Sequence, residues 1–364
     1  MTENTTYDQL KTQRHLSLEW RGINSTQICF EKSCFSFKKD HVTYAIEIAV
    51  IGNEKKISIS VDTPTTFEKI YHYLGDIRRY EYLVDGAFYC MKKCKTDGID
   101  VTNSITDVEL PYFFSEKYKH KIPLELTDKE YKRYFLKWLK LQSSLGIINQ
   151  VALFANCLNG LTADVRISML AECFEAFGKR LEKEKKIIVK SENNTTRTVQ
   201  CENCKEKFEL SIRGKKSFAC YMTALIETYG KTIFSREYRR RKTLIQKIVK
   251  TRNKVFHVNA KQKGVLGGAQ CGFYAIKLEW MFRYIIWLEM GFPKDKLEPV
   301  LEQGCVPVEG EAGPVFKPNI LKMDGGLETI YWTTLLQKEK IKIQSVPLKL
   351  GICWIFLCIY RINL

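Results

Sequence analysis

Arg252 and His257 stand five residues apart in a segment whose apolar residues recur at helical spacing. Burying an unpaired charge is costly, so an arginine within an apolar stripe requires a compensating anion. A fixed cation near an imidazole, which titrates near neutral pH, suits phosphodiester cleavage, because negative charge builds on the phosphate while a proton moves. With Asn253 beside the arginine, the pattern predicts a ribonuclease-type site on this helix. The apolar stripe consists of Ile245, Ile248, Val249, Val255 and Phe256.

A simpler interpretation of the same residues stays open. Arg252 would then be a surface arginine, and His257 would lie near the C-terminus of a helix. An imidazolium interacts favourably with the last backbone carbonyls of a helix. The two interpretations differ in whether Arg252 is buried against an anionic partner.

The segment that carries these residues is strongly basic. The chain has a formal net charge of +17, and ten basic residues stand between Lys231 and Lys254 against a single acid, Glu237. Such a run is either a solvated helix face or a surface for phosphates. Its position beside the Arg–His pair favours the second interpretation and predicts RNA as the partner. The predicted backbone contacts are Lys247, Lys250, Lys254, Arg240 and Arg241.

The composition favours a globular protein of the reducing cytoplasm. Of 364 residues, 45% are hydrophobic, which suffices for one or two domain cores. Residues 1–18 lack the apolar stretch of a signal peptide, so we expect the thirteen cysteines to be reduced thiols. The longest apolar run in the tail, residues 350–360, is shorter than the roughly 18–20 residues of a membrane span. We therefore expect a cytoplasmic protein with no transmembrane segment.

Patterning divides the chain into a β-rich and a helical part. Residues 28–37, 42–50 and 56–61 predict strands, and residues 65–79 predict the one helix of a β-rich domain spanning 1–123. From Thr127 onward helical periodicity dominates, beginning with a capping box between Thr127 and Glu130. The predicted fold class is α+β, with an all-α antiparallel bundle over 124–292 and a tail over 293–364.

Four further helices are predicted within the bundle. The first ends at Asn159-Gly160, the second covers 163–181, the third carries Arg252 over 235–258, and the last covers 271–290 before Gly291. In the second helix the apolar side chains predicted to face inward are Leu170, Cys173, Phe174 and Phe177. A small β-hairpin insertion, residues 186–216, interrupts them. Its Cys201 and Cys204 have the spacing of half a zinc site, but the chain has no second such pair. With Cys220 as a possible third ligand, zinc stays an alternative to solvated cysteines, and we expect no other cofactor.

Three segments resemble the HEPN superfamily of metal-independent ribonucleases. They are residues 169–177 (Met-Leu-Ala-Glu-Cys-Phe-Glu-Ala-Phe), the motif from Arg252 to His257, and residues 282–288 before Gly291. The similarity covers roughly residues 124–292 and is closest to the ApeA-like HEPN branch, which is associated with bacterial anti-phage abortive infection. More weakly, residues 67–89 look like the N-terminal β-rich domain fused to such proteins.

The resemblance implies a role for each site residue. His257 would be the general acid/base that assists attack by the substrate's 2′-hydroxyl, and Arg252 would stabilise charge on the scissile phosphate. Asn253 would orient the phosphate or His257, and Glu175 matches the acidic position of the family's earlier helix. The resemblance also implies that the bundle forms a homodimer with two motifs facing each other, and that no metal is needed.

Three hypotheses about function follow. The first is a metal-independent endoribonuclease, the effector of an abortive-infection or toxin-like system, whose N-terminal domain senses a phage-derived trigger or a regulatory partner. The second is a HEPN-like module that binds RNA or a nucleotide without cutting it. The third is an adaptor at a membrane surface that uses the basic run and the apolar tail, residues 348–364.

Overall fold

The computed structural model describes residues 14–23, 30–52, 54–85, 91–109, 124, 126–157, 161–191, 195–200, 205, 207–212, 216–258 and 261–305. The chain divides into two units, residues 1–322 and 323–364, and the second lies wholly outside the described residues. Cys201, Cys204 and the apolar tail also lie outside them, so the zinc alternative and the role of the tail stay predictions.

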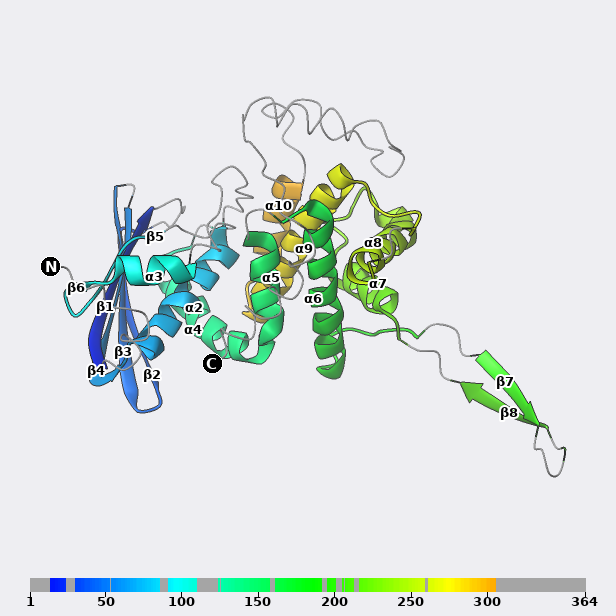
Figure 1. Cartoon of the computed structure of the whole chain (residues 1–364), viewed down its shortest axis with the longest axis horizontal. Helices are drawn as coiled ribbons and strands as arrows, with labels where there is room; N and C mark the ends of the chain where they lie inside the picture. Colours follow the sequence, from blue (N-terminus) through cyan, green and yellow to red (C-terminus); the bar gives the residue numbers. More distant parts are fainter. Residues whose placement is uncertain are drawn as a thin grey trace. The chain divides into compact units, whose positions relative to one another are not determined.

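Six strands form one antiparallel sheet in the order β2-β3-β4-β1-β5-β6 (Figure 1). One face of the sheet is apolar because alternate residues of β4, such as Ile57 and Ile59, are buried while their neighbours are not. Helix α2 (Phe67–Asp85) packs on β1 and β4 and buries Ile70 and Leu74. The strands are β1 (Arg14–Ile23), β2 (Lys32–Lys39), β3 (Val42–Ile51), β4 (Glu54–Thr66), β5 (Met91–Thr96) and β6 (Ile99–Asp100).

The predicted α+β class is confirmed, but the details of its β-rich part differ. The predicted strands at 42–50 and 56–61 correspond to β3 and β4, and the predicted helix to α2. The expectation of a single helix was wrong, because α3 (Thr102–Glu109) follows the sheet. Strands β1, β5 and β6 were missed. In β1 the apolar residues Leu16, Leu18 and Trp20 do alternate with polar ones, so the signal was present in the sequence, whereas β5 has only Met91 and Cys94 as apolar residues and β6 has two residues.

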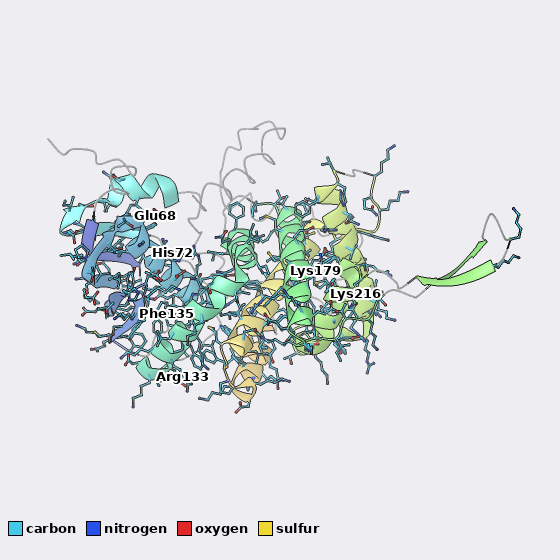
Figure 2. The ribbon with its side chains drawn as sticks, turned by 90° about the horizontal axis from the view of Figure 1, so that it is seen from below. Glu68, His72, Arg133, Phe135, Lys179 and Lys216 are labelled. Carbon is cyan, nitrogen blue, oxygen red and sulfur yellow. The ribbon has the colours of Figure 1, made fainter. Side chains whose placement is uncertain are left out.

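A buried ion pair joins the sheet to the first helices. The Lys55 ammonium of β4 lies 2.8 Å from the Glu81 carboxylate of α2, and both side chains are almost fully buried. Tyr131 of α4 (Asp128–Leu145) donates a hydrogen bond of 3.2 Å to the same carboxylate. Phe135, one turn further along α4 and labelled in Figure 2, packs edge-on against Phe35 of β2. Polar and aromatic contacts therefore hold α4 against the sheet module.

The helical part begins with the predicted capping box. The Thr127 hydroxyl accepts from the Glu130 backbone N–H, and the Glu130 carboxylate accepts from the Thr127 N–H at 3.1 Å, so this prediction is confirmed. Gly146 ends α4 with a φ of 52°, a conformation that favours glycine. The following helices are α5 (Ile147–Cys157), α6 (Ala163–Lys183), α7 (Phe218–Tyr229), α8 (Arg241–Phe256), α9 (Gly268–Glu289) and α10 (Lys294–Cys305).

Helix α6 is the centre of this bundle, since it packs against α5, α7, α8 and α9. The side chains predicted to face inward, Leu170, Cys173, Phe174 and Phe177, are all buried. Between α6 and α7 lies a two-stranded antiparallel hairpin, β7 (Thr195–Gln200) and β8 (Lys207–Ile212), as predicted. No helix among the described residues is long and apolar enough to cross a membrane.

Two differences concern the helices themselves. Helices α7 and α10 were not predicted, and the helix that carries Arg252 begins at Arg241 rather than near 235. Residues 231–237 instead form turns, followed by the short 3-10 helix η3 (Tyr238–Arg240). The reason is a tertiary contact: Glu237 is buried and pairs with Lys277 of α9 at 2.7 Å. Such a contact is invisible to local helix propensity.

A second buried contact connects α2 to α9. The Arg283 guanidinium, fully buried in α9, donates to the backbone carbonyls of Leu83 and Val84 at 2.9 and 3.0 Å. The Trp287 indole N–H also donates to the Leu83 carbonyl, at 3.1 Å. These carbonyls belong to the last turn of α2, where unsatisfied acceptors and the helix dipole favour a cation. Arg283 therefore caps α2 from another helix.

Candidate active site

Helix α8 presents one apolar side to the bundle and one polar side outward. Leu244, Ile245, Ile248 and Thr251 are buried. The Thr251 hydroxyl accepts from the Leu266 backbone N–H at 2.9 Å, which ties the segment ahead of α9 to this helix. The predicted apolar stripe is thus buried only over its first half, because Phe256 is 43% exposed. Its second half is available for contacts outside this chain.

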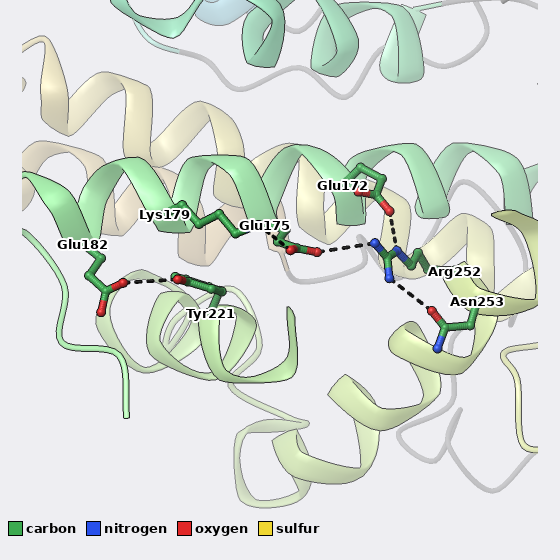
Figure 3. A network of polar contacts seen from close by, with 7 residues as sticks. All are labelled: Glu172, Glu175, Lys179, Glu182, Tyr221, Arg252 and Asn253. Carbon is green, nitrogen blue, oxygen red and sulfur yellow. Dashed lines mark hydrogen bonds and ion pairs between the residues drawn. The ribbon is translucent and has the colours of Figure 1, made fainter. Parts of the chain in front are cut away.

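Arg252 lies at the boundary between these halves and is held by acids of α6 (Figure 3). Its side chain is 22% exposed, and its Nε donates to the Glu172 carboxylate. Its Nη2 lies 3.4 Å from a Glu175 oxygen, and its Nη1 donates to the Asn253 amide oxygen at 3.2 Å. The guanidinium carbon also lies 5.7 Å from the ring centroid of Phe218 in α7. All three nitrogens of the guanidinium therefore have partners.

The acids form part of a polar stripe along α6. Glu172, Glu175, Lys179 and Glu182 follow one another at helical spacings of three and four residues, which places them along one side of the helix. Lys179 pairs with Glu175 at 2.7 Å. Glu182 accepts from the Tyr221 hydroxyl at 3.2 Å and pairs with Lys216, which precedes α7 (Figures 2 and 3). The stripe thus faces both α7 and α8.

His257 stands at the end of α8 rather than inside it. It is the C-cap residue, with its backbone N–H bonded to the Asn253 carbonyl at 3.1 Å, and its side chain is exposed. Five residues advance a helix by about 140°, whereas four advance it by about 40°, so Asn253 and His257 share a side and Arg252 does not. The simpler interpretation was therefore right to place His257 at the C-terminus of a helix. It was wrong about Arg252, which is mostly buried and paired with acids of α6.

The residue after His257 has an unusual backbone. Val258 has a φ of 49°, in the left-handed region that glycine normally occupies after a helix. For a β-branched residue this conformation costs about 1–2 kcal/mol. The residue is 76% exposed, so no burial offsets the cost. Strain of this kind is concentrated at functional sites, and here it adjoins the exposed imidazole.

The predicted RNA contacts fall into two groups. Lys250 and Lys254 on α8 and Arg240 in η3 are exposed and have no acidic partner among the described residues. Arg241 instead pairs with Glu227 of α7 at 2.7 Å and lies over the Tyr238 ring. Lys247 is partly buried. The exposed cations therefore carry most of the uncompensated positive charge near the site.

Two other groups near the site hold their protons tightly. Burial, together with the charge of Glu172, raises the pKa of the Cys173 thiol far above its usual value. Burial also raises the pKa of Tyr221, and the charges of Glu182 and Glu175 act in the same direction. Both groups are therefore neutral near pH 7, so Cys173 is no thiolate nucleophile.

The sequence pattern singled out Arg252 and Asn253, the family resemblance added Glu175, and the structure brings these three together. It does not bring His257 into contact with them through any side chain of the described residues. The pattern missed Glu172, which forms the main contact with Arg252, and Phe218. Glu172 lies one helical turn before Glu175, so a search for acids on the same side of α6 would have found it.

An all-helical bundle with this motif at the end of α8 defines the class of the domain, a HEPN module of the nuclease type. Within that class, residues 168–296 match the model of the Apea-like HEPN family. The match runs from within α6 into the start of α10 and contains every predicted residue of the site. Neither the curated proteins nor the solved structures contain a match to this chain.

Proposed function

We propose that the HEPN domain is an endoribonuclease that cleaves RNA through attack of the substrate's own 2′-hydroxyl. The observation that carries the proposal is the arrangement around Arg252: a partly exposed guanidinium, an amide bonded to it, and an exposed imidazole one turn further on. A guanidinium recognises phosphate oxygens through paired N–H groups. The exposed cations Lys250, Lys254 and Arg240 would hold the flanking phosphates.

In this proposal His257 moves the proton, and Arg252 stabilises the negative charge that develops on the scissile phosphate. Asn253 links the two sides of the helix, since it contacts Arg252 and shares a side with His257. Because Arg252 and His257 do not meet within one chain, we propose that a homodimer completes the site. The exposed Phe256 and Val258, which flank His257, are the surface that the second copy would cover.

The cellular role that we propose is that of an effector in anti-phage abortive infection or a toxin-like system. The β-rich part, whose helix α2 contacts α9, would then transmit a trigger to the nuclease. A non-catalytic module that binds RNA or a nucleotide is the second candidate, because the same exposed cations would serve binding alone.

The test is cleavage of total cellular RNA by the purified full chain in EDTA. We expect fragments that end in 2′,3′-cyclic phosphate, and a rate about 10²–10⁴-fold lower for His257→Ala. His72→Ala, which removes a 58% exposed histidine from α2, is the matched control and should cleave like the wild type. Equal cleavage by the wild type and His257→Ala would contradict the mechanism. RNA binding without products from either protein would favour the binding module.

A further inference from the structure

The two acids on Arg252 are not equivalent. Glu172 binds Nε, and among the described residues no other cation pairs with it. Glu175 reaches Nη2 only at 3.4 Å, near the limit of a hydrogen bond, while its other oxygen lies 2.7 Å from the Lys179 ammonium. Glu175 thus has a second cation to pair with when it leaves Arg252, and Glu172 has not.

Binding a phosphate requires that this arrangement change. A guanidinium grips a phosphate through two N–H groups on one edge, and each terminal nitrogen carries two N–H groups. If Glu172 stays on Nε and Glu175 leaves Nη2, the edge formed by Nη1 and Nη2 becomes free. Asn253 can keep its contact through the second N–H of Nη1. The departure of Glu175 also removes a negative charge that would repel the phosphate.

Resting on the ribonuclease function proposed above, we propose that Glu172 is the positioning residue of Arg252 and that Glu175 is an exchangeable counter-ion. The scissile phosphate displaces Glu175 from Nη2, and the Glu175 carboxylate then pairs with the Lys179 ammonium alone. Glu172 keeps the guanidinium oriented throughout. Solvent exposure does not distinguish the two acids, since Glu172 is 39% and Glu175 21% exposed, so the assignment rests on their different partners.

Distinct roles for Glu172 and Glu175 predict a different result for RNA binding than the net charge of the site does. Removing either negative charge should tighten RNA binding if only the net charge matters. If the two acids have different roles, Glu175→Gln tightens RNA binding, whereas Glu172→Ala weakens it because Arg252 loses its orientation. We expect a change of up to about fivefold in either direction, which corresponds to the roughly 1 kcal/mol of an exposed ion pair.

The experiment measures fluorescence anisotropy of a labelled 2′-O-methyl RNA oligonucleotide, which the proposed mechanism cannot cleave, with the full chain at fixed salt. Glu172→Gln is the rescue variant, since its amide oxygen still accepts from Nε, and it should bind at least as tightly as the wild type. Glu184→Gln is the matched control. It removes the acid at the C-cap of α6, which pairs with Arg180 and Lys186, and it should leave RNA binding unchanged.

Tighter binding by Glu172→Ala, or unchanged or weaker binding by Glu175→Gln, would overturn the proposal. Thermal unfolding of each variant separates loss of fold from loss of orientation. Cleavage of the corresponding unmodified RNA gives an independent readout, in which Glu172→Ala should lower kcat and Glu175→Gln should lower KM. If the wild type binds RNA but does not cleave it, the ribonuclease function fails, and the opposite signs in the binding assay still decide the roles of the two acids.

Discussion

Two arginines in neighbouring helices show how differently one side chain can be used. Arg283 in α9 is fully buried, and neutral backbone carbonyls at the end of α2 accept its hydrogen bonds. Arg252 in α8 is 22% exposed, and carboxylates of α6 accept its hydrogen bonds. The carbonyls cannot leave without unwinding α2, whereas a carboxylate can turn to solvent or to Lys179. The first contact joins two parts of the chain, and the second is suited to exchange.

The surroundings of the two arginines also differ, since Arg283 is enclosed by aromatic rings and Arg252 lies near an exposed helix end. The guanidinium carbon of Arg283 lies 5.9, 6.0 and 5.2 Å from the ring centroids of Tyr82, Trp280 and Trp287. These rings exclude water and strengthen each hydrogen bond of the guanidinium. Beside Arg252 the helix ends in an exposed imidazole and a strained valine. The α2–α9 contact therefore stabilises the fold, whereas the side chains of the candidate site are held by fewer buried contacts.

Arg283→Met should produce the largest change in stability. Methionine fills a similar volume but removes the N–H groups that Arg283 donates to the Leu83 and Val84 carbonyls, of which Leu83 keeps the Trp287 N–H. A buried acceptor that loses its partner costs about 1–3 kcal/mol, so we expect a loss of about 2–5 kcal/mol in the free energy of unfolding. Urea unfolding followed by circular dichroism measures it.

The control is Arg133→Met in α4, labelled in Figure 2. Arg133 is exposed, lies over the Tyr134 ring at 4.5 Å and should contribute less than about 1 kcal/mol. If Arg283→Met were no more destabilising than Arg133→Met, the distinction between the two arginines would be wrong.

Arg252→Met should change stability little but lower RNA cleavage strongly. The acids that it releases are partly exposed, with side-chain exposures of 39% for Glu172 and 21% for Glu175, so water and Lys179 can satisfy them. We expect the free energy of unfolding to change by less than about 1 kcal/mol. On the proposed function, RNA cleavage should fall about 10²–10³-fold, because a charge that stabilises the transition state is lost. Unfolding and cleavage measured on one preparation test both parts.

A loss of stability as large as that of Arg283→Met would instead make Arg252 a structural residue. Intact cleavage with intact stability would remove Arg252 from the mechanism and favour the non-catalytic binding module.

The sequence alone could not distinguish these arginines, because both stand in helices with apolar neighbours. What separates them lies far along the chain: Leu83 is 200 residues from Arg283, and Glu172 is 80 residues from Arg252. Local signals did predict other features correctly. The capping box at Thr127, the apolar stripe of α6 and the end of α9 near Gly291 all depend on residues within one or two turns. Long-range pairing has no such signature.

The candidate site was likewise predicted only where its residues are close together in the sequence. The spacing of Arg252, Asn253 and His257 is local, and so was visible in the sequence. The end of α8 at Phe256 was not predicted, because Val258 is a poor residue for the left-handed conformation that ends the helix there. The chain adopts it nevertheless, with the Val258 N–H bonded to the Val255 carbonyl at 3.3 Å. A residue that contradicts its local preference is a place to look for function.

The smallest effect that we expect tests this strained end of the site. Val258→Gly removes the steric cost of the left-handed conformation, about 1–2 kcal/mol, but adds the backbone entropy that glycine loses on folding, about 0.5–1 kcal/mol. The free energy of unfolding should therefore rise by up to about 1 kcal/mol. If the strain holds the end of α8 in the arrangement that His257 needs, the more stable variant should cleave RNA more slowly.

Lys185→Gly supplies the matched control, because Lys185 follows α6 with a φ of 57° and lies outside the candidate site. Its side chain is not β-branched, so the gain in stability should be smaller, and RNA cleavage should not change. Equal stability gains in the two variants would show that the valine adds no strain beyond that of any non-glycine residue. Unchanged cleavage by Val258→Gly would separate the strain from the function and leave the exchange at Arg252 as the feature that distinguishes this region from the α2–α9 contact.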